Sequence, residues 1–403
     1  MIRLALRNVL RQRLRTALTL LAIALGVASL ILARGFVEDV LVQLAESTIH
    51  SQIGHVQVFR AGYSEAGRAN PFAYVIEAPQ DLKQAVSGAP GVQESMARLT
   101  FSGLLNNGRA DLPIFGEGVE PVKERRLGSA LTLVGGRWME ERDKFGLMVG
   151  EGVASSLGLK IGDRVTLLAN TREGALNTAE LELTGVFRSF SKEFDAVAVR
   201  VPLTAAQELL AMSGATSLVI LLDRTDQTDA AAAWVAGKLP GERFEVRTWT
   251  QLADFYAGTA AIYKRQFAVL IGIIFAMMLL GVINTVNMSV FERTAEFGTL
   301  RAMGDTPRDV FRLVVVENAW LGVLGATLGV GVGVAVALGV SAVGIPMPPP
   351  PNADVGYTAT IRIVPLAIAL AFWLGVASTL LASLLPAWRV ARVPIVDALR
   401  QSI

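Results

Sequence analysis

The chain offers few residues that could carry out covalent or metal chemistry. It contains no cysteine, which excludes disulfides, thiolate catalysis and cysteine-bound metals. Its two histidines, His50 and His55, have no cluster of carboxylates near them in the sequence, so we expect no metal site there. No nucleophile–base pair stands out, and no G-x-x-x-x-G-K-[ST] phosphate loop is present. These features argue against an enzyme and against an ATP site of the chain's own.

The elements that would position any functional group are mostly membrane helices. Hydrophobic residues make up 52% of the 403 residues, and the net charge of +2 argues against a nucleic-acid binder. Four apolar stretches are long enough to cross a bilayer, which takes roughly 20 residues. Their cores contain no Asp, Glu, Lys or His, the groups that an ion-coupled carrier needs. Mechanical work would therefore have to be powered from another subunit.

The basic residues predict the orientation of these spans. Arginines are concentrated before the first span, between the second and third spans, and after the fourth. The loop between the third and fourth spans has only one arginine, Arg362. By the positive-inside rule, both termini and the 292–317 segment are cytoplasmic and the large middle section lies outside. Arg3, Arg7, Arg11 and Arg15 recur every fourth residue, which predicts an amphipathic helix on the membrane surface; a cleaved targeting peptide is the alternative.

We therefore predict a membrane protein with four transmembrane helices, one N-terminal and three C-terminal, and a large α+β extracytoplasmic domain inserted between the first and second. Alternating strands and short helices in the outer domain suggest two lobes, the second inserted into the first. The predicted segments are a cytoplasmic amphipathic helix (1–16), spans at 17–36, 267–291, 319–342 and 363–386, the outer domain (37–264; lobe one about 52–119 and 213–250, inserted lobe about 120–212), a cytoplasmic loop (292–317), an outer loop (343–362) and a cytoplasmic tail (387–403).

The charged segment 292–317 lies between two long uncharged stretches, and its own signals are specific. Thr306 supplies an N-cap hydroxyl, Pro307 suits the first helical position, and Asp309 puts a carboxylate at the third. A helix is thus predicted to start at Thr306, after Gly304 ends the one before it. We expect a short helix lying against the membrane, where an external subunit could push; a solvated basic face among lipid head groups is the alternative.

Two patterns within the spans predict helix contacts. Gly325, Gly329 and Gly333 recur every fourth residue and give the third span a bare face for close packing. Asn284 and Asn287, one turn apart in the second span, suggest an interhelical hydrogen bond rather than a substrate role.

Three stretches resemble the ABC-transporter permeases of the MacB/LolC/LolE/FtsX type. They are the N-terminal segment RNVLRQRLRT with LTLLAIALGV, the sequence ERTAEFGTLRAMG preceded by Asn284 and Thr285, and the C-terminal LPAWRVAR with DALR. Shorter stretches, such as Gly116 to Pro121, resemble the outer domain of the lipoprotein-releasing branch. The likeness covers nearly the whole chain and follows the order of the predicted topology.

The resemblance implies a permease without a fused ATPase domain in the bacterial inner membrane. Such permeases act as homo- or heterodimers with two copies of a separate ATPase, which binds ATP and Mg, and with membrane lipids and a periplasmic carrier or adaptor around them. They use mechanotransmission, in which ATP-driven motion reaches the outer domain. The implied coupling residues are Glu296, Arg301, Thr306, Pro307, Arg308, Asp309, Phe311 and Arg312.

The resemblance leaves two functions open. One is extraction or export of a hydrophobic or lipidated cargo such as a lipoprotein; the other is regulation of an extracytoplasmic partner, such as a cell-wall hydrolase, without any cargo. In a dimer of such permeases, the outward halves of the first two spans could border an apolar cargo space. The residues expected there, with ordinary lipid-facing surface as the alternative, are Val27, Leu30, Ile31, Phe267, Leu270 and Ile274.

Overall fold

The computed structural model describes residues 13–67, 70–348 and 356–400, and these divide into two compact units. The helical unit contains the described residues up to Leu41, then Ala260–Met347 and 358–400. The α/β unit contains Val42–Thr259 and the adjoining described part of Pro348–Tyr357. The predicted amphipathic helix lies almost wholly outside the described residues.

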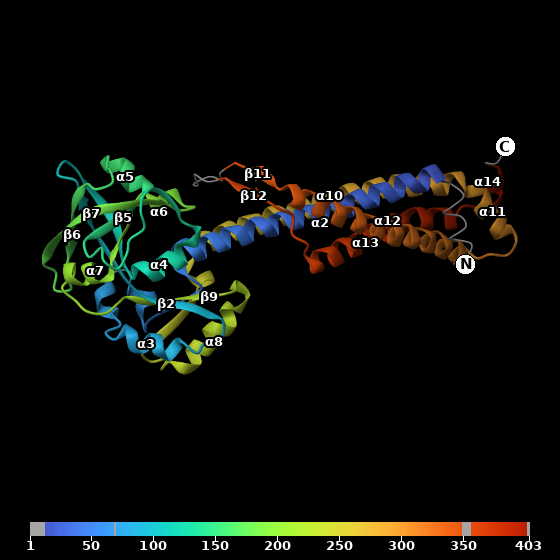
Figure 1. Ribbon diagram of the computed structural model, residues 1–403. Helices are drawn as coiled ribbons and strands as arrows, with labels where there is room; N and C mark the ends of the chain where they lie inside the picture. Colours follow the sequence, from blue (N-terminus) through green and yellow to red (C-terminus); the bar gives the residue numbers. More distant parts are fainter. Residues whose placement is uncertain (1–12, 68–69, 349–355, 401–403) are drawn as a thin grey trace. The chain divides into compact units, whose positions relative to one another are not determined.

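Four helices in the described chain are long and apolar enough to cross a membrane. They agree with the predicted spans in number and order. The first three run beyond their predicted ranges, and the fourth begins two residues later than predicted and ends five residues later, because the helical hydrogen bonding continues past the apolar stretch. Figure 1 shows them in blue, orange and red. They are α2 (Arg13–Thr48), α10 (Asp254–Glu292), α12 (Pro307–Val343) and α13 (Pro365–Ala391); the unit also holds α11 (Thr294–Ala302), α14 (Ile395–Arg400) and the strand β11 (Ile345–Met347), with β12 (Tyr357–Ala359) pairing to it.

The glycine face of α12 packs against α2. A Cβ at Gly329 would lie 2.7 Å from the Val27 Cβ and 2.8 Å from the Ala24 carbonyl oxygen. The nearest α2 atoms would lie 2.9 Å from a Cβ at Gly325 and 3.1 Å from one at Gly333. Since lipid tails are as apolar as the helices, close backbone approach rather than hydrophobic burial stabilises such contacts. The three glycines thus fix where α2 and α12 cross.

A buried carboxylate joins α2 to the α12–α13 loop. Asp39 is 2% exposed and accepts hydrogen bonds from the Thr360 amide and hydroxyl, each at 2.8 Å, and from the Arg362 Nε at 3.1 Å. The Arg362 amide in turn donates to the Gly35 carbonyl at 3.2 Å. These bonds fasten the loop to the side of α2.

The strands of the α/β unit pair side by side in one continuous series. Its order is β10-β1-β9-β2-β3-β8-β5-β7-β4, and β6 pairs with both β2 and β7. The strands are β1 (Val56–Arg60), β2 (Val92–Asn106), β3 (Asp111–Val119), β4 (Thr132–Gly136), β5 (Gly146–Gly150), β6 (Arg164–Asn170), β7 (Leu176–Arg188), β8 (Ala198–Pro202), β9 (Ser217–Leu222) and β10 (Phe244–Thr248).

Short helices and turns cover the strands and connect them. The α-helices are α3 (Pro79–Val86), α4 (Pro121–Leu127), α5 (Glu151–Leu157), α6 (Lys192–Asp195), α7 (Leu203–Leu209), α8 (Thr228–Lys238) and α9 (Trp249–Leu252). The π- and 3-10 turns are η1 (Ile49–Ile53), η2 (Tyr63–Gly67), η3 (Pro71–Tyr74), η4 (Gly128–Ala130) and η5 (Thr225–Gln227).

The two lobes divide within β2, and the predicted boundary near residue 119 is wrong. Up to Arg98, β2 pairs with β9 in the first lobe; from Leu99 it pairs with β3 in the second. Leu99, Phe101 and Ile114 accordingly belong to the core that contains β5, β7 and β8. One 15-residue strand serves both lobes, so its sequence carries no turn signal at the boundary.

Candidate energy-coupling site

The helix start predicted at Thr306 is present in the structure. Thr306 and Asp309 form a reciprocal capping box: the Asp309 amide donates to the Thr306 hydroxyl at 3.3 Å, and the Thr306 amide donates to the Asp309 carboxylate at 3.0 Å. Pro307 occupies the first turn, where its missing N–H costs nothing. Gly304, with φ of 115°, provides the left-handed residue that ends the preceding turn.

The prediction of a separate short helix at Thr306 is wrong. The helix that starts there is α12 itself, which continues for 37 residues through the third span. No proline or glycine interrupts it before Gly322, so nothing in the sequence ends the first turns. The short helix in this segment is α11, just before it. A push on the first turn of α12 is therefore a push on the whole span.

The first turns of α12 present a basic, partly apolar surface. Arg308 and Arg312, one turn apart, are both exposed, and no salt bridge joins either of them to another described residue. Phe311 is half-buried beside them, while Met303 in the preceding turn is 73% exposed. On the opposite side, Val310 and Val314 are buried in the helical core. This surface, Met303 with Arg308, Phe311 and Arg312, is called the α12 docking face below.

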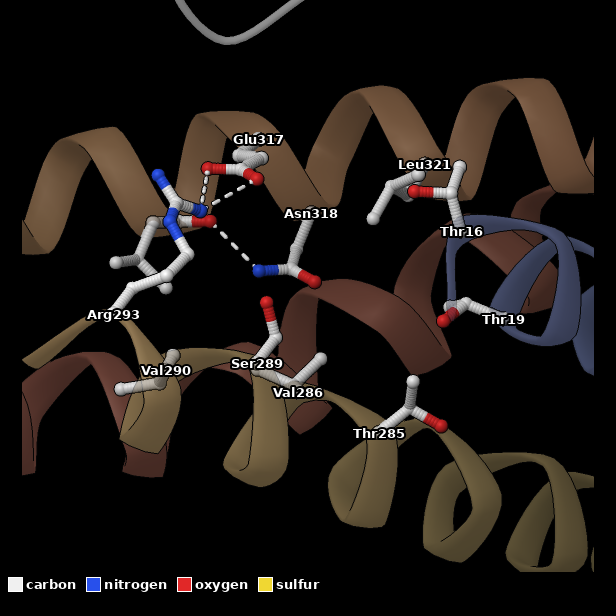
Figure 2. Close-up of a pocket in the computed structure, with 11 residues that line it drawn as sticks. Thr16, Thr19, Thr285, Val286, Ser289, Val290, Arg293, Glu317, Asn318 and Leu321 are labelled. Carbon is white, nitrogen blue, oxygen red and sulfur yellow. Dashed lines mark hydrogen bonds and ion pairs between the residues drawn. The ribbon is translucent and has the colours of Figure 1, made fainter. Parts of the chain in front are cut away.

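A buried ion pair joins α12, five residues beyond Arg312, to the junction of α10 and α11. Arg293, at the junction of α10 and α11, donates from Nη1 to both carboxylate oxygens of Glu317 on α12, each at 2.8 Å. Its Nε donates to Glu296 at 3.0 Å, and its guanidinium lies 5.1 Å from the Phe297 ring centroid. Arg293 and Glu317 are 9% and 8% exposed. This pair ties the end of α10 to α12 (Figure 2).

A small polar cavity extends from the ion pair into the helix bundle. Its volume is about 30 Å³, which is enough for a water molecule or two. Thr16 and Thr19 of α2, Thr285 and Ser289 of α10, and Asn318 of α12 line it (Figure 2). Three helices therefore contribute polar side chains to this cavity.

Two of the predicted coupling residues, Glu296 and Arg301, are half-buried and bond to other parts of the helical unit. Glu296 is bonded to Arg293, and the Arg301 guanidinium donates to the Val393 carbonyl between α13 and α14. A Cβ at Gly298 of α11 would lie 2.8 Å from the Ala398 Cβ of α14. These contacts connect α11 to Arg293 at the end of α10, to the α13–α14 junction and to α14.

Sequence reasoning missed Arg293 and Glu317 as partners. The available signal was their position: Glu317 directly borders a long uncharged stretch, and Arg293 is the second charged residue after another, following Glu292. A charge at the edge of a span is a candidate for pairing across helices.

The structure does not support most of the predicted cargo residues. Val27, Leu30 and Ile31 are 0%, 4% and 2% exposed, because they face the glycines of α12 and the rest of the helical core. Phe267 is 8% exposed, with the Arg34 guanidinium 5.5 Å from its ring centroid. The prediction is wrong for these four.

Leu270 and Ile274 remain accessible on α10. Leu270 is 39% exposed and Ile274 is half-buried. Among the described residues, no group of three or more His, Asp or Glu side chains could hold a metal ion.

Two family models account for most of the chain. The model described as MacB-like periplasmic core domain matches residues 16–238, more than half of the chain, and that described as FtsX-like permease C-terminal matches residues 268–395. The chain belongs to the MacB/LolC/FtsX-type family of ABC-transporter permeases. As a family member with four apolar helices, it is a multi-pass membrane protein that carries a MacB-like periplasmic domain.

Individual proteins and one solved structure are similar to this chain. The lipoprotein-releasing system transmembrane protein LolC of Xylella fastidiosa is 23% identical, with 95% of this chain and 92% of that protein covered. The macrolide export ATP-binding/permease protein MacB of Hyphomonas neptunium is 25% identical over 99% of this chain and 60% of that protein. The solved periplasmic region of MacB from Actinobacillus actinomycetemcomitans is 13% identical, covers 50% of this chain and 93% of that structure, and gives a TM-score of 0.37.

Proposed function

We propose that this chain is the permease subunit of an ATP-driven transporter that extracts or exports a hydrophobic or lipidated cargo by mechanotransmission. A separate ATPase subunit docks on the α12 docking face, and its closure moves α12 and, through α11 and the Arg293–Glu317 pair, α10. The α/β unit responds outside the membrane and acts on the cargo. The observation that carries the proposal is the continuity of α12, which begins at an exposed basic cap and runs unbroken through its span.

The chemistry of the docking face favours a protein partner over lipid head groups alone. Lipid head groups would require only the charges of Arg308 and Arg312. The face also contains the 73%-exposed Met303 and the ring of Phe311, and it is held in place by a capping box and a buried ion pair. Rigid support of a mixed basic and apolar surface suits a shaped groove on a partner.

The exposed apolar face of α10 is evidence for a second permease subunit. Apolar side chains along it are widely exposed, Met277 to 69% and Leu280 to 66%. The interhelical bond predicted for Asn284 and Asn287 is not formed within the described residues, and both side chains are exposed on the same helix. Unpaired amides facing hydrocarbon are unfavourable, so we infer that a second copy or a paralogous permease covers them.

The proposed orientation places the docking face in the cytoplasm and the α/β unit outside. Because the chain has no cysteine, single introduced cysteines test it directly. Met303→Cys and Glu173→Cys both fall on exposed sites. An impermeant maleimide should label Glu173→Cys on intact spheroplasts and Met303→Cys only after lysis. The opposite labelling pattern would show that the chain is inserted in the opposite orientation.

The coupling role is tested with the full chain and its ATPase. Arg308→Glu combined with Phe311→Ala should leave expression and membrane insertion normal while abolishing co-purification with the ATPase, since charge reversal at a docked contact creates a repulsive pair. Arg389→Glu, an exposed arginine on α13, is the matched control for charge and should retain binding. Normal binding and transport by the double variant would refute the docking face.

The cargo class is tested in proteoliposomes. Similarity to LolC along nearly the whole chain favours a lipidated cargo. With its ATPase present, the permease should release a dansyl-labelled diacylated lipopeptide from the bilayer only when ATP is hydrolysed. ATP-dependent movement of the α/β unit without release of any lipopeptide would instead favour the regulatory function.

A further inference from the structure

Four charged side chains form a closed cluster deep in the α/β unit. Arg98, Glu117, Glu124 and Arg200 are each 5% exposed or less. Arg98 reaches Glu124 at 2.7 Å and Glu117 at 3.3 Å, while Arg200 reaches Glu117 at 2.9 Å and Glu124 at 3.2 Å. Each guanidinium therefore contacts both carboxylates, and each carboxylate contacts both guanidiniums.

The same two guanidiniums bind the end of α2. Arg200 donates from Nη2 to the Ser51 carbonyl at 2.8 Å, and Arg98 donates from Nη1 to the Gln52 carbonyl. Both carbonyls belong to η1, the π turn that follows α2 directly, before Gly54 with φ of 72°. The last carbonyls of a helix lack intrahelical partners and carry its negative dipole end, so cations are favourable there. The cluster thus caps the long helix that contains the first span.

The cluster also lies where the two lobes join. Arg98 is the last residue of β2 in register with β9 of the first lobe, opposite Ser217. Glu117 on β3 and Arg200 on β8 are direct partners in the parallel pairing of the second lobe. A displacement of η1 would therefore act on the strand shared by both lobes and on the centre of the second lobe's sheet.

Stability alone gives a weak account of this arrangement. Buried ion pairs can often be replaced by apolar side chains without loss of stability. The cluster is also incompletely satisfied, since Arg98 Nε and Glu124 Oε2 have no hydrogen-bond partner within the described residues. Burial raises the pKa of Glu117, but Arg98 and Arg200 outweigh it and lower that pKa below its usual value, so the carboxylate stays charged. Apolar residues could not provide directional bonds to two backbone carbonyls.

We propose that the Arg98–Glu117–Glu124–Arg200 cluster is the anchor through which movement of α2 is delivered to the two lobes of the α/β unit. Arg98 and Arg200 are positioning residues: they hold the end of the helix, and the two glutamates hold them. The inference rests on the proposed mechanotransmission and adds to it the place at which the motion enters the outer domain.

The test measures lobe movement in the full chain with its ATPase in nanodiscs. Spin labels on Ala236→Cys of α8 and Glu173→Cys in the β6–β7 turn, both exposed, report the distance between the lobes. The distance distribution is recorded without nucleotide and after trapping with ATP and vanadate. The test variant combines Arg200→Met with Glu117→Gln, which removes one bond to α2 without leaving an unpaired buried carboxylate.

We expect a nucleotide-dependent shift in the wild type and its loss in the test variant, with ATPase binding and hydrolysis retained. Arg188→Met, which breaks the Arg188–Glu151 ion pair between β7 and α5 of the second lobe, is the matched control and should keep the shift. If the test variant does not fold, Arg200→Lys replaces it in the experiment. Lysine keeps the positive charge but cannot contact both carboxylates as the guanidinium does, so the nucleotide-dependent shift should become smaller.

The outcomes separate the two proposals. A wild-type shift that persists in whichever variant folds overturns the anchor and leaves the proposed function intact. A wild type that binds and hydrolyses ATP without any shift overturns both. Loss of the shift in Arg188→Met as well would show a general effect of broken ion pairs and would also overturn the anchor.

Discussion

Replacement of Glu317 by Gln is the sharpest test of the support behind the docking face. The substitution keeps the shape of the side chain but leaves the Arg293 guanidinium with a neutral partner at a position where it is only 9% exposed. Removing one partner of a buried ion pair typically costs 3–5 kcal/mol. Arg293 keeps its 3.0 Å bond to Glu296, so we expect a smaller loss, about 2–3 kcal/mol of unfolding free energy.

Glu296→Gln is the matched control. Its side chain is 42% exposed, and solvent screens its interaction with Arg293, so its loss should cost only about 0–1 kcal/mol. The measurement is the free energy of unfolding in mixed micelles, titrated with sodium dodecyl sulfate, for the full chain and both variants. Equal costs for the two substitutions would show that the Arg293–Glu317 bond is not the dominant contact and would refute the reasoning.

Three further predictions concern other contacts. Gly329→Ala should destabilise the helical unit by about 1–3 kcal/mol through its clash with α2, whereas Gly331→Ala, with nothing within 4 Å of its Cβ, should be neutral in the same micelle assay. Asp39→Asn should weaken the attachment of the α12–α13 loop to α2 by about 1–3 kcal/mol and should therefore speed hydrogen exchange in this loop. Loss of the 48%-exposed Arg362 side chain should have little effect on that exchange. Burial, and then the charge of the neighbouring histidine, lower the pKa of His55 from 6.5 to about 4. The unfolded chain therefore binds the proton more readily, so unfolding free energy should fall between pH 6.5 and 4 by up to about 3 kcal/mol; His55→Asn should remove this slope, and an unchanged slope would contradict the assignment.

The sequence by itself determined the number, order and kind of the main elements. A bilayer requires about 20 apolar residues in a helix, so the uncharged stretches could form little else. The start of α12 was also predictable from the local sequence, because the capping hydrogen bonds of Thr306 and Asp309 and the proline at 307 all lie within a single turn. The same holds for β7, where apolar and polar side chains alternate as expected of a strand.

Only the tertiary structure decided which residues meet. Arg293 and Glu317 are 24 positions apart, and the sequence shows two charges without showing that they face each other. From the sequence alone, Val27 and Ile31 cannot be distinguished from lipid-facing residues; they are buried because the α12 glycines pack against them. The lobe boundary at Arg98 depends on strand pairing with Ser217, and the anchor at Arg200 depends on a side-chain bond to Ser51; each pair is more than a hundred positions apart. Burial and ion pairing are properties of partners distant in the chain, whereas local signals describe only the path of the backbone between them.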